Sequence, residues 1–482
     1  MSFIFYDIIF LILFVIGVAA FLYKHRKNVE VESKIIFLYK TRMGLDTIDR
    51  IGKKYPRFLN FMSYLIIATG YVMMTFSFLF LIYFVYFMIK SPVVSRVIPI
   101  MPLVPYVTSV YPNLPPFYFT YWIIVIAIIA VGHEFSHGIF ARLNKVRLKS
   151  TGFGFIGPLL AAFVEVDEKQ MAQKPLKAQL SVLAAGSFAN LTMALVFLIL
   201  MNGFFVGAYH ANGLIFQGAY QPNFGSTFST YALDVVNVSS IYAMNGAPVN
   251  NFYSDYQRLK NENITQFEFM AKNKSYFGDK NLLGLAPDNS SQIVLYDDSP
   301  LYRANVSAGL IQEIDSKDKE YKIRDLNDLK NAFKEFSPGE EMTIRSTSGN
   351  YTLTLGEDPA NSSEPYLGMA FIRPNTGAFS GFMSFFVMKE TFVFYEPKSS
   401  GIGGDLIVFI YDLLYWIVLI NFSVMVVNML PFAIFDGGRF FYLSVLGISS
   451  RKTANRMFRL VNWLMLAFLA GIMGIWAVRT FF

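Results

Sequence analysis

The chain has 482 residues, of which 54% are hydrophobic and 16% are charged, and it contains no cysteine. This composition is typical of a membrane protein, and the lack of cysteine excludes disulfides and thiolate metal sites. The formal charge of +7 does not indicate nucleic-acid binding, because the excess basic residues fall in short loops beside apolar segments.

Six apolar segments predict a polytopic α-helical membrane protein that contacts the lipid bilayer directly. They cover residues 3–23, 62–89, 117–141, 178–208, 402–430 and 460–478. The first segment has no basic residues before it and no clear cleavage site, so we expect a retained helix. Lys and Arg are concentrated in residues 24–61, 142–149 and 451–459. The positive-inside rule places these stretches in the cytosol, as expected for a multi-pass protein of the cell membrane.

Two shorter stretches accompany these spans. Residues 91–116 are rich in proline and poor in charge, which predicts an outer loop. Residues 150–168 are apolar but interrupted by three glycines and Pro158, which predicts a re-entrant or hairpin element beside the third span. An exposed strand edge in this element could pair with an unwound substrate, or the element could be a structural loop without substrate contact.

The third span carries the sequence VGHEFSHGIFAR toward its inner end, with His133, Glu134 and His137 in an H-E-x-x-H pattern. On a helix, residues i and i+4 share one face, so both imidazoles can reach one metal ion. A glutamate after the first histidine is the general base of zinc peptidases. Ionisable groups at this depth cost about 2.5–3.5 kcal/mol each on insertion scales, which favours function over a chance match or satisfied core histidines.

The fourth span contains Gly186 and Asn190 among other small residues. Gly186 allows close packing of helices. An asparagine in the membrane needs a partner, and Asn190 could bond to substrate backbone, to the reaction oxyanion or to a neighbouring helix.

Residues 209–400 are polar and contain seven N-x-Ser/Thr sequons. The sequons begin at Asn237, Asn263, Asn273, Asn289, Asn305, Asn350 and Asn361. Surface sequons indicate a glycosylation-accessible face, although richness in Asn and Ser would give some by chance. The chain therefore divides into an N-terminal membrane part (1–208), an extracytoplasmic region (209–400) and a C-terminal membrane part (401–482).

Within the outer region, residues 299–356 resemble a PDZ domain, with a strand, a helix at about 325–336, a Pro-Gly turn and two alternating strands. Residues 235–261 look like a second, poorer copy. PDZ folds bind an extended peptide along a strand edge. A bulky domain that blocks large substrates is the alternative, so the fold class is a helical membrane protein with an inserted soluble α+β PDZ-like region.

The fifth span ends in NMLPFAIFDGG, residues 428–438. A catalytic zinc site needs a third protein ligand, and Asp436 is the best candidate. Pro431 should end the helix, and Gly437 permits a tight turn that directs the carboxylate. Alone, Asp436 would be interpreted as a helix-terminal carboxylate near the interface.

Together these motifs resemble the site-2 protease family of intramembrane zinc metalloproteases. The resemblance rests on three pieces in order: HEFSH at 133–137, G-x-x-x-N at 186–190, and N-x-x-P-x-x-x-x-D-G at 428–437. The basic segment after the first span and the AFVE stretch look most like archaeal members. Ser187 is a departure, because proline is common there in the family.

The resemblance implies a zinc endopeptidase that cleaves transmembrane helices of other proteins in regulated intramembrane proteolysis. It assigns one Zn²⁺ per chain to His133, His137 and Asp436, and the general base to Glu134. It further assigns substrate binding or transition-state support to Asn190 and Asn428. The active site should open toward the cytosol, and no nucleic-acid partner is expected.

Two other functions are compatible with parts of the sequence. Prenyl-protein peptidases are also zinc membrane proteases, but they use a glutamate as third ligand and would not need the motif that contains Asp436. A non-catalytic receptor or chaperone could bind peptides through the PDZ-like region. The intact Glu134 argues against that function, because binding alone has no need of a general base.

Overall fold

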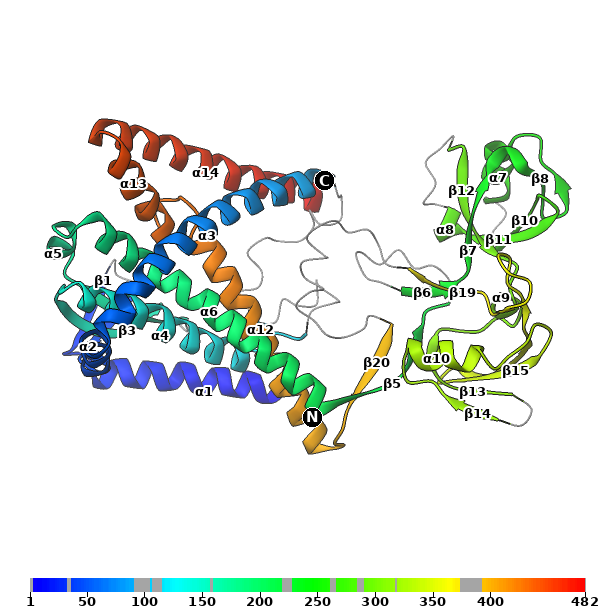
Figure 1. Ribbon diagram of the computed structural model, residues 1–482, viewed down its shortest axis with the longest axis horizontal. Helices are drawn as coiled ribbons and strands as arrows, with labels where there is room; N and C mark the ends of the chain where they lie inside the picture. The colour runs from blue at the N-terminus through cyan, green and yellow to red at the C-terminus, as the bar shows by residue number, and fades with distance from the viewer. Residues whose placement is uncertain are drawn as a thin grey trace. The chain divides into compact units, whose positions relative to one another are not determined.

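The computed structural model describes residues 3–32, 36–90, 105, 115–156, 159–218, 228–260, 266–283, 290–316, 319–372 and 392–481. The chain forms two compact units (Figure 1). The first comprises Met1–Phe204 with Val408–Phe482, and the second comprises Phe205–Ile407. The predicted outer loop at 91–116 falls almost entirely outside the described residues.

Six helices are long and apolar enough to cross a membrane, as predicted. They are α1 (Phe3–Lys24), α3 (Pro56–Lys90), α4 (Phe119–Leu143), α6 (Leu176–Ala208), α12 (Ile402–Asn428) and α14 (Arg451–Phe481). With the mostly β second unit, they confirm the predicted fold class.

Two of these helices begin earlier than hydropathy indicates. Helix α3 begins at Pro56, a residue that suits the first helical position. Helix α14 begins at Arg451, and the Ser450 hydroxyl caps it by accepting from the Thr453 amide at 3.2 Å. Four basic residues that were expected in a loop before the sixth span therefore lie on the first turns of α14, because Lys and Arg form helices readily.

Shorter elements of the first unit include three helices, α2 (Leu45–Lys54), α5 (Glu168–Ala172) and α13 (Asp436–Ile448). They also include an antiparallel sheet in the order β1 (Val29–Glu32), β2 (Ile36–Thr41), β3 (Leu148–Ile156), β4 (Leu159–Val166). The interrupted stretch at 150–168 is thus mostly a β-hairpin, β3–β4, and residues 157–158 at its tip lie outside the described residues. Gly152 is needed here, since a Cβ would lie 2.3 Å from the Tyr39 carbonyl oxygen on β2.

One core cluster packs α2, α3, α4, α6, α12 and α13 together around the C-terminal half of α4. Its buried members include Ile48, Ile66, Ala184, Met429 and Phe440. A second cluster joins the first half of α4 to α12 through Trp122 and Trp416. Because lipid tails are as apolar as these side chains, close packing is what holds such helices together. Helix α4 is therefore fixed along its whole length.

The N-terminus of α4 is held by α1, which lies beside it (Figure 1). The buried Asp7 carboxylate accepts hydrogen bonds from the backbone N–H groups of Phe119 and Thr120, both at 2.8 Å. Tyr118 precedes the helix and provides no side-chain cap. Asp7 thus serves as an N-cap supplied by another helix, where a negative charge also complements the helix dipole.

The second unit contains the same strand–helix pattern twice. One copy is β8 (Ile241–Met244), β9 (Ala247–Pro248), α7 (Phe252–Lys260), β10 (Gln266–Ala271) and β11 (Lys274–Asp279). The other is β13 (Gly309–Asp315), β14 (Glu320–Lys322), α10 (Leu326–Phe333), β15 (Glu341–Ser346) and β16 (Gly349–Thr354). In both, the first strand pairs antiparallel with the second and the third, and the third pairs with the fourth.

Each copy belongs to a six-stranded sheet, and each has its own buried core. The helix expected at 325–336 is α10, whose first amides at Asn327 and Asp328 are capped by the Asp325 carboxylate. The other elements are β5 (Tyr209–Phe216), β6 (Phe228–Tyr231), β7 (Leu233–Asn237), a 3₁₀ turn (Val238–Ser240), α8 (Lys280–Leu283), β12 (Gln292–Asp297), α9 (Pro300–Arg303), β17 (Gly356–Glu357), β18 (Pro365–Tyr366), β19 (Met369–Ile372) and β20 (Val393–Pro397).

Candidate metal centre

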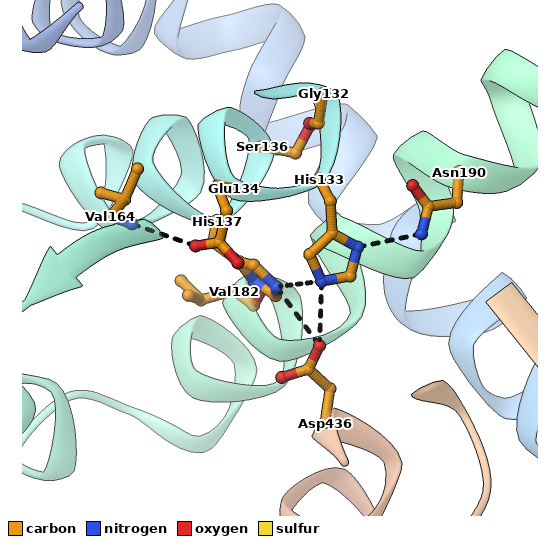
Figure 2. A network of polar contacts seen from close by, with 9 residues as sticks. All are labelled: Gly132, His133, Glu134, Ser136, His137, Val164, Val182, Asn190 and Asp436. Carbon is orange, nitrogen blue, oxygen red and sulfur yellow. Dashed lines mark hydrogen bonds and ion pairs between the residues drawn. The ribbon is translucent and has the colours of Figure 1, made fainter. Parts of the chain in front are cut away.

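Three side chains from α4 and α13 converge at one point (Figure 2). The His133 Nε2 and His137 Nε2 atoms lie 3.4 and 3.3 Å from the same oxygen of Asp436, and 3.0 Å from each other. The three ligand atoms all lie within 4.8 Å of one another. In the part of the chain that the structure describes, no other group of three His, Asp or Glu residues meets this condition.

Asp436 reaches the histidines because α12 ends early and α13 begins close against it. Helix α12 ends at Asn428, three residues before Pro431, as the proline predicts. Asp436 is the first residue of α13. A Cβ at Gly437 would lie 2.5 Å from the Leu430 carbonyl oxygen, so this glycine is needed for close approach of two backbone segments. It lies in the first turn of α13, in place of the tight turn expected from the sequence.

Helix α6 contacts both imidazoles, through residues that face their Nδ1 atoms (Figure 2). His137 Nδ1 lies 2.7 Å from the carbonyl oxygen of Val182, and His133 Nδ1 lies 3.0 Å from the amide nitrogen of Asn190. A Cβ at Gly186 would lie 2.4 Å from His137 Nε2 and 2.6 Å from His133 Nε2. Gly186 therefore leaves the space that the two rings occupy.

Glu134 lies on the same stretch of α4 but points toward the sheet. Its carboxylate accepts a hydrogen bond from the backbone N–H of Val164 at 3.0 Å (Figure 2). Strand β4 is the last strand of its sheet, and among the described residues only β3 pairs with it. The glutamate therefore stands at the free edge of β4, beside the two histidines.

These groups open into a cavity of about 950 Å³. Its wall includes His133, Glu134, His137 and Asp436, and its rim is charged. On the rim, Arg439 Nη1 lies 3.2 Å from the Glu168 carboxylate and joins α13 to α5. A hydrogen bond from the Ser150 hydroxyl and two nearby lysines lower the pKa of the Glu165 carboxyl below its ordinary value. The rim therefore carries ionised groups at neutral pH.

The structure brings His133, Glu134, His137, Asn190 and Asp436 close together, but it shows no contact of Asn428 with them. Asn428 is half-buried at the last position of α12, and among the described residues its side chain has no hydrogen bond to the converging group. The roles of Val182 and Val164 could not be anticipated, because both act through backbone atoms. Arg439 directly follows the D-G-G of the third motif, a position that could have drawn attention to it.

Comparison with known protein families identifies the family to which this chain belongs. A family model described as peptidase family M50 matches residues 121–472, which is more than half of the chain and includes all four motif residues His133, Glu134, His137 and Asp436. The chain belongs to peptidase family M50. As an M50 protein it is an intramembrane metallopeptidase, and proteases of this family bind zinc. None of the curated proteins compared matches the chain.

The donor atoms suit the metal of the M50 family. Two imidazole nitrogens and one carboxylate oxygen are ligands that Zn²⁺ accepts, and three protein ligands leave a fourth position open for catalysis. The three ligand atoms lie within 4.8 Å of one another, close enough for one ion to contact all of them. The residues present therefore fit a single zinc ion.

Proposed function

We propose that His133, His137 and Asp436 are the zinc ligands and that Glu134 is the general base for hydrolysis of peptide bonds in or near transmembrane helices of other proteins. The observation that carries this proposal is the convergence of two imidazoles four residues apart on α4 with a carboxylate almost 300 residues later. A chance H-E-x-x-H match would not predict that convergence.

The chemistry divides between the metal and the chain. Zinc, when bound, polarises the scissile carbonyl and makes water a stronger nucleophile. Glu134 takes a proton from the attacking water and returns it to the leaving amine. The backbone N–H of Val164 holds the Glu134 carboxylate at the edge of the cavity, where a substrate would lie beside it.

A helical substrate must unwind before its peptide bond can be attacked, because its amides are bonded within the helix. The edge of β4 that no other described strand covers offers an extended segment main-chain partners on either side of Val164, whose own N–H is bonded to Glu134. We therefore propose that the unwound substrate aligns along β4. Asn428 keeps its predicted role in substrate support, although the resemblance alone supports it.

The second unit is proposed to lie outside the cell and the metal centre to open toward the cytosol. Charge asymmetry along the chain supports this orientation. Five of the seven sequons fall within the described residues, and the asparagine of each is exposed: Asn237, Asn273, Asn305, Asn350 and Asn361. The repeated strand–helix topology supports two PDZ-like copies, which could recruit a peptide at a strand edge or limit substrate size. The closer likeness to archaeal members also stays a prediction.

The decisive experiment compares the native protein with Glu134→Gln on a model transmembrane substrate in liposomes. The substitution keeps the shape of the side chain and removes the base, so we expect cleavage to fall by 10²-fold or more, the range for general-base catalysis. A zinc chelator should also abolish cleavage by the native protein. Bound zinc should remain near one per chain in the variant. Equal cleavage by both proteins would contradict the role of Glu134.

A further inference from the structure

Helix α6 presents three consecutive positions of one face to the metal centre, and each acts on a histidine. Val182, Gly186 and Asn190 are spaced four residues apart, so they lie on one face of the helix. Val182 offers a carbonyl oxygen to His137, Gly186 leaves room for both rings, and Asn190 offers its amide to His133. The two histidines are thus held by the same helix but by different chemical groups.

The carbonyl of Val182 and the amide of Asn190 differ in which histidine tautomer they allow. A carbonyl oxygen can only accept, so Val182 requires that His137 Nδ1 carry its proton. His137 Nε2 then keeps its lone pair and faces the other ligand atoms. This is the tautomer that a metal-binding histidine needs, and a hydrogen bond at the far ring nitrogen commonly fixes it.

His133 must reach the same tautomer to bind metal through Nε2, so its Nδ1 must also donate. The atom that now faces it is the Asn190 amide nitrogen, at 3.0 Å, and that nitrogen can only donate. The Asn190 Oδ1 atom is buried and has no hydrogen-bond partner among the described residues, although Asn190 is 0% exposed. A half-turn of the amide would satisfy both groups, because Oδ1 would then accept from His133 Nδ1.

We infer that Asn190 is a positioning residue, which holds His133 in its metal-binding tautomer through the side-chain oxygen and acts on the zinc ion only through that ring. This inference rests on the proposed ligand set and differs from the expected contact of Asn190 with substrate or oxyanion. In that orientation the Asn190 oxygen acts on His133 as the Val182 carbonyl oxygen acts on His137, because each can only accept a hydrogen bond from Nδ1.

The test measures zinc affinity of the full-length protein by competition with a chelating dye, comparing the native chain, Asn190→Leu and Asn190→Asp. Loss of a group that orients a metal-bound histidine typically weakens metal binding by about 10–100-fold, so we expect this loss in Asn190→Leu. Aspartate retains the acceptor, so Asn190→Asp should keep zinc affinity within about 10-fold of native, as carboxylate–histidine–zinc arrangements do.

Asn421→Leu is the matched control. Asn421 is also 0% exposed in a membrane helix, but its amide nitrogen donates to the Ile417 carbonyl of its own helix at 2.8 Å. We expect native zinc affinity in this variant. If Asn190→Leu does not fold, Asn190→Asp still decides, because a contact that needs the amide as donor would be lost in it.

The outcomes separate this inference from the proposed function. If the native protein binds no zinc, the proposed ligand set fails. If the native protein binds zinc and Asn190→Leu binds it equally well, only the role of Asn190 fails, and a substrate contact is favoured. Loss of zinc from a folded Asn190→Asp as well would overturn the acceptor argument.

Discussion

At the scale of single residues, the site is defined as much by an absent side chain as by those present. Gly186 lies against both Nε2 atoms. Helix α6 cannot shift to make room for a larger side chain there without disturbing the contacts of Val182 and Asn190 with the histidines. Sequence alone indicated helix packing for this glycine. The actual neighbours are the imidazoles of another helix, which residue type could not reveal.

Gly186→Ala should therefore weaken zinc binding by more than about 10-fold, because the rings must shift away from a Cβ placed at 2.4 and 2.6 Å. The measurement is zinc affinity by chelator competition. Gly203→Ala is the control on the same helix, since a Cβ at Gly203 meets nothing within 4 Å. That substitution should leave zinc binding unchanged. Native zinc affinity in Gly186→Ala would show that the rings have more freedom than their packing indicates.

The four motif residues could be predicted because their chemistry is visible in their types and spacing. Two histidines at i and i+4, a glutamate between them and an aspartate beside glycines carry a pattern that sequence preserves. Asn190 was recognised as a site residue, but its contact with His133 depends on the rotation of α6 about its axis. Hydropathy does not encode that rotation.

At the scale of elements, one residue of the sequence carries a sign of the pairing of α1 with α4. An aspartate at the fifth residue of an apolar span is costly unless it is paired. Asp7 finds its partners in two backbone amides at the start of α4, and backbone partners leave no trace in the sequence. Backbone pairing also explains why the sequence predicts either a re-entrant element or a hairpin for residues 150–168. The hairpin forms because β3 pairs with β2, and that pairing is made by backbone groups.

Replacing Asp7 by leucine should destabilise the protein by about 1–2 kcal/mol, the upper range for loss of an N-cap. We expect a lower Tm in thermal unfolding of the detergent-solubilised protein. The zinc content should stay native, because Asp7 caps the end of α4 roughly 20 Å from His133 at 1.5 Å per residue. Glu357→Gln, at an exposed position of β17 away from any helix terminus, is the control and should leave Tm unchanged. An unaltered Tm in Asp7→Leu would mean that other contacts hold α4.

At the scale of the whole molecule, the six spans and the inserted region were predictable because hydropathy and composition change sharply at their boundaries. The boundaries of α3 and α14 were less predictable, since helices continue into polar sequence beyond the bilayer. The repeated topology of the second unit was only partly visible in the sequence. Strand pairing is conserved between the two copies even where the turn and helix signals of residues 235–261 are weak.

The orientation of the molecule can be tested directly, because the chain has no cysteine and any introduced one is unique. Asn361→Cys lies on an exposed turn of the second unit, and Lys53→Cys on an exposed position of α2. In sealed right-side-out vesicles, a membrane-impermeant maleimide should label Asn361→Cys at once. It should label Lys53→Cys only after the vesicles are permeabilised, since the basic segment 24–61 is expected in the cytosol.

The cysteine-free parent provides the background for both measurements. The reverse labelling pattern would show that the topology is inverted, with the cavity entrance on the outer face of the membrane. Its substrates would then have to be cleaved from the outside, and the charge asymmetry between the loops would no longer explain the topology. Equal labelling of both positions in sealed vesicles would contradict the six-span topology itself, because the three spans α3, α4 and α6 between residues 53 and 361 place these residues on opposite sides of the membrane.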